Sequence, residues 1–302
     1  MILEETYTLR NGVNIPKIGL GTWLIDGEAA TVAVKEAALA GYRHFDTAQG
    51  YGNEAQVGEG VRTCGVARDK LFVTSKIDAF IKDYESAKGS IDKSLQDMGL
   101  DYLDMMLIHS PQPWTHFRGD DRYLEGNLEV WRAMEEAYAG GKLRAIGVSN
   151  FEVEDIDNLL DNVLVKPMVN QVLAHVANAP SSLIDHCKGK DILVEAYSPM
   201  GHGEVLSMPE VVCLARKYGV SAAQLCIRFC LELGMVALPK ASSQAHIVQN
   251  ASVDFNISEA DMKTLLSLAP IKDYGTASEF PVYGGKMASD YSLTPGDFVP
   301  RN

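Results

Sequence analysis

An alternation of short apolar runs with helix-like segments continues along most of the chain and constrains the fold more than any other feature. The apolar runs have the length and composition of buried strands. The segments between them carry apolar side chains at helical spacing, as in residues 28–40, where the pattern ends at Gly41. The predicted strands lie within residues 18–23, 42–48, 71–77, 103–109, 145–150, 167–172, 192–197 and 235–240.

Strands that are separated by helices run parallel, because each connection has to cross the face of the sheet. Eight such units predict a (β/α)8 barrel, a fold that holds about 250 residues or more as one domain. The alternative is an open doubly wound sheet, which should show a dinucleotide fingerprint after an early strand. Residues 19–24 and 201–206 reach Gly-x-Gly but lack the third glycine. We therefore predict a single domain over residues 1–302, with the barrel at 18–250.

Further segments precede and follow the predicted barrel. Residues 5–18 form two extended runs around Asn11-Gly12, which predicts a hairpin with a type I′ turn that plugs the N-terminal end of the barrel. Residues 257–302 contain one more helix, with Ser258 as its N-cap, and a turn-rich tail. The tail either packs against the barrel wall or also covers the mouth of the site. Its aromatic residues are Tyr274, Phe280, Tyr283, Tyr291 and Phe298.

Charge and composition exclude several kinds of partner. Lys and Arg number 27 and Asp and Glu number 40, which gives a net charge of −13 at pH 7. No nucleic acid or anionic membrane is expected as a partner, because proteins that bind these usually present a basic face. No apolar run approaches the roughly 20 residues that cross a bilayer, and the first residues lack a signal-peptide pattern. Together with five scattered cysteines, this predicts a cytoplasmic protein with reduced thiols.

Polar residues lie at the ends of most predicted strands. In a parallel barrel these ends meet at the rim that carries the chemistry, so we expect the side chains to converge there. Taken singly, each also has a structural explanation: an ion pair for Lys76, a buried hydrogen bond for His109, a capping role for Asp46. The residues are Asp46, Lys76, His109, Ser149, Asn150, Gln171, Tyr197 and Lys240.

Asp46, Tyr51, Lys76 and His109 together suit the protonation of a carbonyl oxygen. A tyrosine with a pKa of ~10 is a weak acid at neutral pH, and a neighbouring ammonium lowers that pKa. Asp46 would keep Lys76 charged and oriented, and His109 would hydrogen-bond the carbonyl oxygen. The sequence shows no nucleophile elbow and no metal-binding motif, so no metal is expected. This combination suits reduction by a hydride donor.

Seven segments, in chain order, resemble the motifs of the aldo-keto reductase superfamily. They are FDTAQGYGNE, FVTSKI, LDMMLIHSP, IGVSNF, VNQV, EAYSPMG and LPKASSQAHIVQN. The resemblance implies a (β/α)8 barrel that binds NADP(H) across its C-terminal rim and reduces aldehydes or ketones to alcohols. It implies that Tyr51 is the general acid, that Lys76 and Asp46 tune its pKa, and that His109 orients the carbonyl.

The same resemblance implies a cofactor site. Ser149, Asn150 and Gln171 resemble the residues that hold the nicotinamide carboxamide, and Tyr197 resembles the ring that stacks on the nicotinamide. The full set of expected cofactor-binding residues is Gly21, Thr22, Asp46, Ser149, Asn150, Gln171, Tyr197, Ser198, Met200, Lys240, Ser242, Ser243, His246 and Asn250.

The segment expected to bind the adenosine 2′-phosphate departs from the family pattern. Where the family has Ser and Arg, this chain has Ala241 and His246. A hydroxyl is lost, and a mostly neutral histidine cannot bind a phosphate in the bidentate manner of a guanidinium. We still expect NADP(H) as the cofactor because Lys240 remains, with a weakened preference that also admits NAD(H).

The substrate pocket is expected beside the four catalytic residues. Trp23 matches the pocket tryptophan of the family and should form an apolar wall, the alternative being a core tryptophan. Ser110 follows His109 where some mammalian members of the family carry a second tryptophan, so the pocket should be more open there.

A long connection between Ser110 and about Gly126 looks like a loop that covers the substrate, and Trp114 within it is expected to line the pocket. Arg118 and Arg122 of this connection either attract an anionic substrate or are simply solvated.

These features predict a monomeric, cytoplasmic, NADPH-preferring reductase of small-molecule carbonyl compounds. The alternative is a nucleotide-binding regulatory subunit of the same fold with little turnover, as the potassium-channel β-subunits of the superfamily suggest; the intact set of catalytic residues argues against it. An isomerase or aldolase with Lys76 as a Schiff-base amine is disfavoured, since Asp46 would keep that amine charged.

Overall fold

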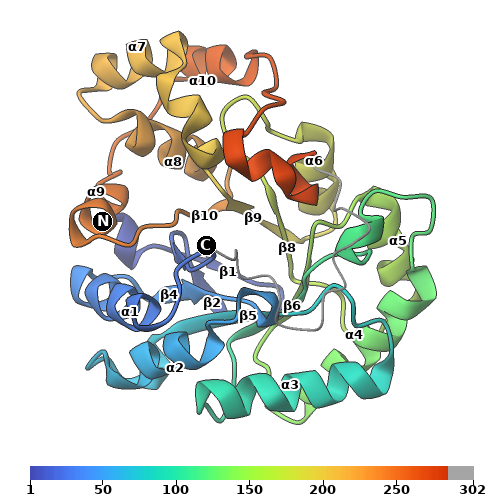
Figure 1. The fold of residues 1–302 in the computed structure, drawn as a ribbon. Coiled ribbons are helices and arrows are strands. Elements are labelled where there is room, and N and C mark those ends of the chain that lie inside the picture. Colours follow the sequence, from blue (N-terminus) through green and yellow to red (C-terminus); the bar gives the residue numbers. More distant parts are fainter. Residues whose placement is uncertain (285–302) are drawn as a thin grey trace.

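The computed structural model describes residues 1–284, and its centre is a barrel of parallel strands with helices arranged around it (Figure 1). Parallel bridges from Ile18 to Ala237 and from Gly21 to Lys240 join the first strand to the last, which closes the barrel. The predicted (β/α)8 fold is confirmed. The barrel strands pair in chain order and are β3 (Leu20–Gly21), β4 (His44–Asp46), β5 (Phe72–Ile77), β6 (Met105–Ile108), β7 (Ile146–Ser149), β8 (Val169–Leu173), β9 (Leu193–Tyr197) and β10 (Val236–Leu238).

Several helices are capped by residues at their ends. Asp83 accepts a hydrogen bond from the N–H of Ser86 ahead of α3, and Ser221 forms a capping box ahead of α8. As predicted, α1 ends at Gly41, whose φ of 106° is left-handed. The α-helices are α1 (Glu28–Ala40), α2 (Glu54–Thr63), α3 (Tyr84–Met98), α4 (Leu124–Ala139), α5 (Val153–Asn162), α6 (Ser181–Gly189), α7 (Pro209–Tyr218), α8 (Ala222–Glu232), α9 (Gln244–Ala251) and α10 (Glu259–Leu266).

Short 3₁₀ helices occur in several connections. None of the helices within residues 1–284 is long and apolar enough to span a bilayer. The 3₁₀ helices are η1 (Ile2–Glu4), η2 (Gln49–Tyr51), η3 (Arg68–Lys70), η4 (Trp114–His116), η5 (Gly201–Ser207), η6 (Gly275–Glu279) and η7 (Pro281–Tyr283).

The N-terminal hairpin forms, but its predicted type I′ turn is wrong. The strands β1 (Thr6–Thr8) and β2 (Asn14–Pro16) pair antiparallel. A type I′ turn needs positive φ at both central residues, whereas of Asn11 and Gly12 only Gly12 has it, at 85°. The N–H of Gly12 donates to the carbonyl of Leu9 and the N–H of Leu9 donates to the carbonyl of Val13, each at 2.8 Å. Three residues therefore lie between Leu9 and Val13, one more than in a type I′ hairpin loop. The larger loop needs only one left-handed residue.

Two layers of apolar side chains make up the core. One lies between strands and helices and includes Trp131 and the fully buried, free thiols of Cys226 and Cys230. The other fills the barrel interior, where Leu9 and Ile15 of the hairpin segment join residues at the starts of the strands. The hairpin therefore covers the N-terminal end of the barrel, and the other end carries the polar strand tips.

The chain after the barrel returns to the C-terminal end of the strands. Helix α10 begins at Ser258, whose hydroxyl caps the N–H of Asp261, as predicted. Beyond it, Tyr274 and Tyr283 are buried in a small cluster with Trp23, Tyr197 and neighbouring apolar residues. Of the two expected positions of the tail, its described part thus lies over the mouth of the barrel. The predicted aromatic residues Tyr291 and Phe298 lie outside the described residues.

Candidate active site

A cavity of about 320 Å³ opens at the C-terminal rim of the barrel. Most of the residues expected from the sequence line it. Within residues 1–284, no three His, Cys, Asp or Glu side chains are grouped so as to hold a metal ion. The expected residues that line the cavity are Gly21, Trp23, Asp46, Tyr51, His109, Trp114, Ser149, Asn150, Gln171, Tyr197, Ser198, Met200 and Lys240.

Lys76 lies beneath this cavity, fully buried near the end of β5. Its Nζ donates to Oδ1 of Asp46 at 2.6 Å and to the carbonyl of Thr47 at 2.9 Å. A third hydrogen bond, of 3.2 Å, joins it to the hydroxyl oxygen of Tyr51, which follows β4 in the short helix η2. All three protons of the ammonium are used, so its direction is fixed by its partners.

The charges of this cluster are set by burial and by neighbours. Burial lowers the pKa of Lys76, but Asp46 and Tyr51 together outweigh it, so the pKa is raised and the amine stays charged. Burial raises the pKa of Tyr51 above 10. Lys76 lowers it, as expected, but by less than burial raises it. The expected net fall of the Tyr51 pKa towards neutrality is therefore not found in this structure.

His109 follows β6 and contacts two aromatic rings. Its imidazole lies edge-on to Tyr51, with ring centroids 5.5 Å apart, and to Trp114 at 5.1 Å. Burial and the charges of Lys76 and Lys82 lower the pKa of His109 well below 6.5. The ring is therefore neutral at physiological pH and has one N–H with which to donate to a carbonyl oxygen.

The tips of β7, β8 and β9 form a hydrogen-bonded group at one side of the cavity. Asn150 has a left-handed φ of 62°, and its amide nitrogen donates to the carbonyl of His109 at 3.0 Å. The Tyr197 hydroxyl donates to Oδ1 of Asn150 at 2.8 Å, and the Ser149 hydroxyl donates to the carbonyl of Gln171 at 2.9 Å. This group offers an aromatic face and several amide and hydroxyl groups, which fits a nicotinamide and its carboxamide.

The segment expected to hold the cofactor phosphate lies beside the cavity and only partly lines it. Lys240 lines it, and its Nζ donates to the carbonyl of Leu24 at 3.0 Å. Ser242 and His246 are exposed, and the Ser243 hydroxyl caps α9 by accepting the N–H of His246. The amide groups at a helix N-terminus favour an anion, so this end fits a phosphate.

Thr22 and Asn250, which were expected to bind the cofactor, do not line the cavity. The Thr22 hydroxyl donates to the backbone carbonyl of Asp46 at 2.8 Å. Asn250 is buried within α9. Ala241, which stands in place of the family's Ser, is buried and has no hydroxyl to offer.

Ser110, which was expected to line the pocket, does not line the cavity in the structure. It is fully buried, and its carbonyl accepts a hydrogen bond from Nζ of Lys82 at 2.9 Å. The expected opening is absent, because Trp114, four residues later, lines the cavity and packs against His109. The connecting loop thus supplies a tryptophan to this wall.

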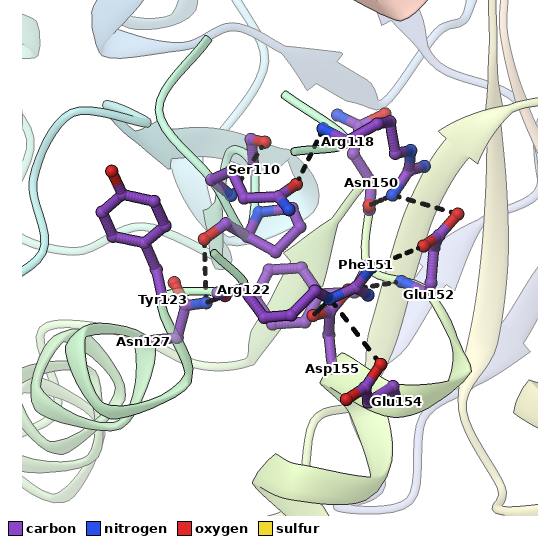
Figure 2. Close-up of polar contacts among 12 residues, drawn as sticks. Ser110, Arg118, Arg122, Tyr123, Asn127, Asn150, Phe151, Glu152, Glu154 and Asp155 are labelled. Carbon is purple, nitrogen blue, oxygen red and sulfur yellow. Dashed lines mark hydrogen bonds and ion pairs between the residues drawn. The ribbon is translucent and has the colours of Figure 1, made fainter. Parts of the chain in front are cut away.

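The loop between β6 and α4 is tied to the start of α5 by ion pairs (Figure 2). Arg122 binds the buried carboxylate of Asp155 at 2.6 Å and Glu152 at 2.9 Å. Arg118 donates to the carbonyl of Asn150 at 3.1 Å and pairs with Glu152 at 3.4 Å. The sequence predicted an attractor of anionic substrates or a solvated side chain, and Arg122 is neither, since its partners lie within the protein.

The outer wall of the cavity includes residues that the sequence did not assign to the site. Trp23 contacts Phe280 at a ring distance of 4.9 Å and His202 at 5.4 Å. The Tyr283 hydroxyl is hydrogen-bonded to Ser198 at 2.7 Å and to His202 at 2.8 Å. The aromatic content of the tail signalled these contacts, but no sequence signal pointed to His202.

A second layer of polar residues lies below the cavity floor. The amide nitrogen of Gln171 donates to Oδ2 of Asp46 and to Oε2 of Glu195, each at 2.9 Å. Glu195 is fully buried and was not predicted as a site residue. A charged residue within the apolar run 192–197 was the available signal.

Comparisons with known proteins agree with this geometry. The model of the Aldo/keto reductase family matches residues 17–270. The chain is 42% identical over 268 residues to the glyoxal reductase of Bacillus subtilis, which covers 88% of this chain and 93% of that relative.

Solved structures give the same answer. An aldo-keto reductase from a Medee basin deep-sea metagenome library matches with a TM-score of 0.82 and 38% identity, covering 87% of this chain and 94% of that one. A Bombyx mori aldo-keto reductase in complex with NADP matches with a TM-score of 0.81 and 30% identity, covering 93% and 98%. As its motifs implied, the chain belongs to the aldo/keto reductase family and is an NAD(P)H-dependent oxidoreductase.

Proposed function

We propose that this protein reduces aldehydes and ketones to alcohols, with Tyr51 as the general acid and NADPH as the favoured cofactor. The observation that carries the proposal is the chain of contacts from Asp46 to Lys76 at 2.6 Å and from Lys76 to Tyr51 at 3.2 Å, next to the cavity. A phenol beside a fixed ammonium is a proton donor whose conjugate base is stabilised. The bound cofactor supplies the hydride.

Each residue has one task in this reaction. The carbonyl oxygen of the substrate accepts hydrogen bonds from Tyr51 and from the neutral imidazole of His109, which polarises the carbonyl. As the carbonyl carbon gains a hydride, its oxygen takes the proton of the Tyr51 hydroxyl. Lys76 stabilises the phenolate that remains, and Asp46 keeps Lys76 charged and in place. Solvent then returns a proton to Tyr51.

The proposed cofactor contacts follow the geometry of the rim. Tyr197 stacks on the nicotinamide, and Ser149, Asn150 and Gln171 hold its carboxamide. Lys240 and the N-terminus of α9 hold the phosphate end. The Bombyx mori relative was solved with NADP, which supports this assignment.

We propose that NAD(H) is also used. Ala241 offers no hydroxyl to a 2′-phosphate, and His246 does not provide the bidentate contact of an arginine. The expected preference for NADPH therefore rests on Lys240 and the helix N-terminus.

The substrate range is proposed to be broad, because the upper wall of the cavity is mainly aromatic. Trp23, Trp114 and Phe280 offer contact area without charge. One relative is named a glyoxal reductase, so glyoxal belongs in a test panel together with larger aromatic and aliphatic aldehydes.

Tyr51→Phe tests the proposal directly. The wild-type protein should oxidise NADPH in the presence of one or more aldehydes, and the variant should lose about 10²–10⁴-fold in kcat while its cofactor affinity, measured by protein fluorescence, stays the same. Unchanged turnover in the variant would contradict the role of Tyr51. Tight NADPH binding by the wild type without turnover on any aldehyde would instead favour a regulatory nucleotide-binding subunit.

We also propose that residues 1–302 form one domain and that the protein works as a cytoplasmic monomer. The uninterrupted strand–helix alternation supports the first point, and the few scattered cysteines support a reducing compartment. A single unfolding transition, a monomer mass in light scattering and cell fractionation are the corresponding tests.

A further inference from the structure

A carboxyl group without an assigned role lies inside the barrel, below the proposed catalytic residues. Glu195, on β9, is fully buried. Its Oε2 accepts a hydrogen bond from Gln171, and its Oε1 is buried with no partner among residues 1–284. The nearest basic group to Oε1 is Nε2 of His44, at 3.9 Å. This is an unusual position for a charged residue, because burying an unpaired carboxylate is costly.

Among the described residues, Glu195 has a single side-chain hydrogen-bond donor, Gln171, which it shares with Asp46. The two N–H groups of the Gln171 amide each end on one carboxyl oxygen, of Asp46 and of Glu195, with both distances 2.9 Å. Two carboxyl groups that meet at one amide repel each other when both are ionised, which favours the protonation of one of them. Asp46 has the cation Lys76 at 2.6 Å. Within residues 1–284 Glu195 has no cation at such a distance, so it is the carboxyl expected to be protonated.

The groups that face Glu195 from the neighbouring strands support this assignment. The polar groups come from three strands: Asp46 and His44 from β4, Lys76 from β5 and Gln171 from β8. On β10, the residue paired in register with Glu195 is the apolar Val236. Burial first, and Lys76 second, lower the pKa of His44 to about 3, so this ring supplies no positive charge. The three protons of Lys76 are used by other acceptors. Burial, followed by the charge of Asp46, raises the pKa of Glu195 to about 8.

We propose that Glu195 is a positioning residue of the reductase: as an uncharged acid it holds the Gln171 amide against Asp46, and its ionisation adds a second negative charge below the Lys76–Tyr51 pair. The charge of Lys76 acts on Glu195 as well as on Tyr51, so an ionised Glu195 competes with the Tyr51 phenolate for the same cation and disfavours the phenolate. Tyr51 therefore keeps its proton to higher pH in the wild-type protein than it does when position 195 cannot ionise. This consequence for catalysis rests on the proposed role of Tyr51.

Infrared spectroscopy of E195Q tests the charge state without any activity. Raising the pH from about 6 to about 10, across the value of about 8, should remove the C=O stretch of a protonated carboxyl from the wild-type spectrum. E195Q should lack this change. The control is E54Q, since Glu54 is another buried carboxyl but binds Ser75 and Ser94 away from Gln171. E54Q should keep the Glu195 band and its loss at high pH. If the wild type and E195Q show the same spectra at both pH values, so that no band is assigned to Glu195, the proposal is overturned.

The pH profile of kcat tests the consequence for Tyr51. E195Q should match the wild type within about twofold near pH 6.5, because a glutamine also offers a carbonyl to Gln171. Its alkaline limb should begin at least about 0.5 pH unit lower, whereas E54Q should follow the wild type. Coincident limbs for E195Q and wild type would contradict the effect on Tyr51. E195M, which removes the acid and fills its space, gives the same two readouts if E195Q does not fold.

The two proposals fail separately. Retained activity in Tyr51→Phe refutes the general acid but leaves the infrared result on Glu195 intact. A wild-type spectrum with no protonated carboxyl assigned to Glu195 refutes the present inference even when Tyr51→Phe is inactive.

Discussion

The ammonium nitrogen of Lys76 lies 3.2 Å from the hydroxyl oxygen of Tyr51. Burial by itself disfavours both the charged ammonium of Lys76 and the phenolate of Tyr51. Lys76 is held in this position by Asp46, so the three residues act as one unit. We expect this pair of contacts to contribute both to the stability of the protein and to the acidity of the phenol.

Lys76→Met should therefore lose activity and stability together. The variant leaves Asp46 buried without its cation, which should cost about 3–5 kcal/mol of unfolding free energy, and it removes the stabilisation of the phenolate, which should lower kcat by about 10²-fold or more. Urea denaturation and NADPH oxidation measure the two effects. Lys70→Met is the control, because the Lys70 side chain is 70% exposed and both quantities should stay unchanged. A kcat within about tenfold of wild type for Lys76→Met would argue against the unit.

His246→Arg should increase the preference for NADPH over NADH. His246 is exposed in the first turn of α9, and an arginine there offers the bidentate contact that a 2′-phosphate favours. The ratio of kcat/KM for NADPH to that for NADH should rise by about tenfold, as one charge-assisted contact contributes about 1.5 kcal/mol, through a lower KM for NADPH. Gln249→Arg, exposed near the other end of the same helix, adds the same charge and should leave the ratio unchanged. An equal gain in both variants would indicate general attraction rather than a phosphate contact.

Arg122→Ala should destabilise the protein more than an ordinary surface substitution. The Asp155 side chain is fully buried, and Arg122, itself 20% exposed, is its ion-pair partner (Figure 2). Removing one member of such a pair leaves a buried charge, so we expect a loss of about 3 kcal/mol, measured by chemical denaturation. Arg132→Ala removes an exposed pair with Glu129 and should change the unfolding free energy by less than about 0.5 kcal/mol. Similar losses in the two variants would mean that Asp155 gains its stabilisation elsewhere.

The stability of E195Q should depend less on pH than that of the wild type. The pKa of Glu195 is raised from 4.5 to about 8 in the folded protein. Between these values the folded protein holds a proton that the unfolded chain has lost, so the contribution of Glu195 to stability falls as the pH rises through this window and is gone above about 8. One pKa unit corresponds to about 1.4 kcal/mol, so the unfolding free energy of E195Q relative to wild type should rise by a few kcal/mol from about pH 5 to about pH 8. A difference that is constant over this range would show that Glu195 is already ionised when buried.

Much of the barrel was predictable from the sequence because its strands are buried on both faces. Such strands read as continuous apolar runs, and each of the eight predicted runs overlaps one barrel strand. The hairpin turn was not predictable in detail. Asn11-Gly12 is compatible with two loop lengths, and the structure uses the one in which only Gly12 is left-handed.

The convergence of the proposed catalytic residues was predictable for a similar reason. Asp46, Lys76 and His109 lie at the ends of neighbouring parallel strands, and the barrel brings strand ends together whatever their separation in sequence. The contacts of His202 with Tyr283, and of Arg122 with Asp155, join loops whose conformations no periodic pattern describes. The protonation of Glu195 depends on which groups surround it, and only the folded arrangement shows that Lys76 is already committed to other acceptors.

The hydrogen bond between Tyr283 and Ser198 has a consequence for how such proteins diversify. Ser198 directly follows the ring proposed to stack on the nicotinamide, while Tyr283 and Phe280 belong to a stretch outside the barrel that stands against Trp23. A gene can therefore exchange or remodel its last segment and so admit new substrates, while the proposed proton-donating residues at the strand ends are inherited intact.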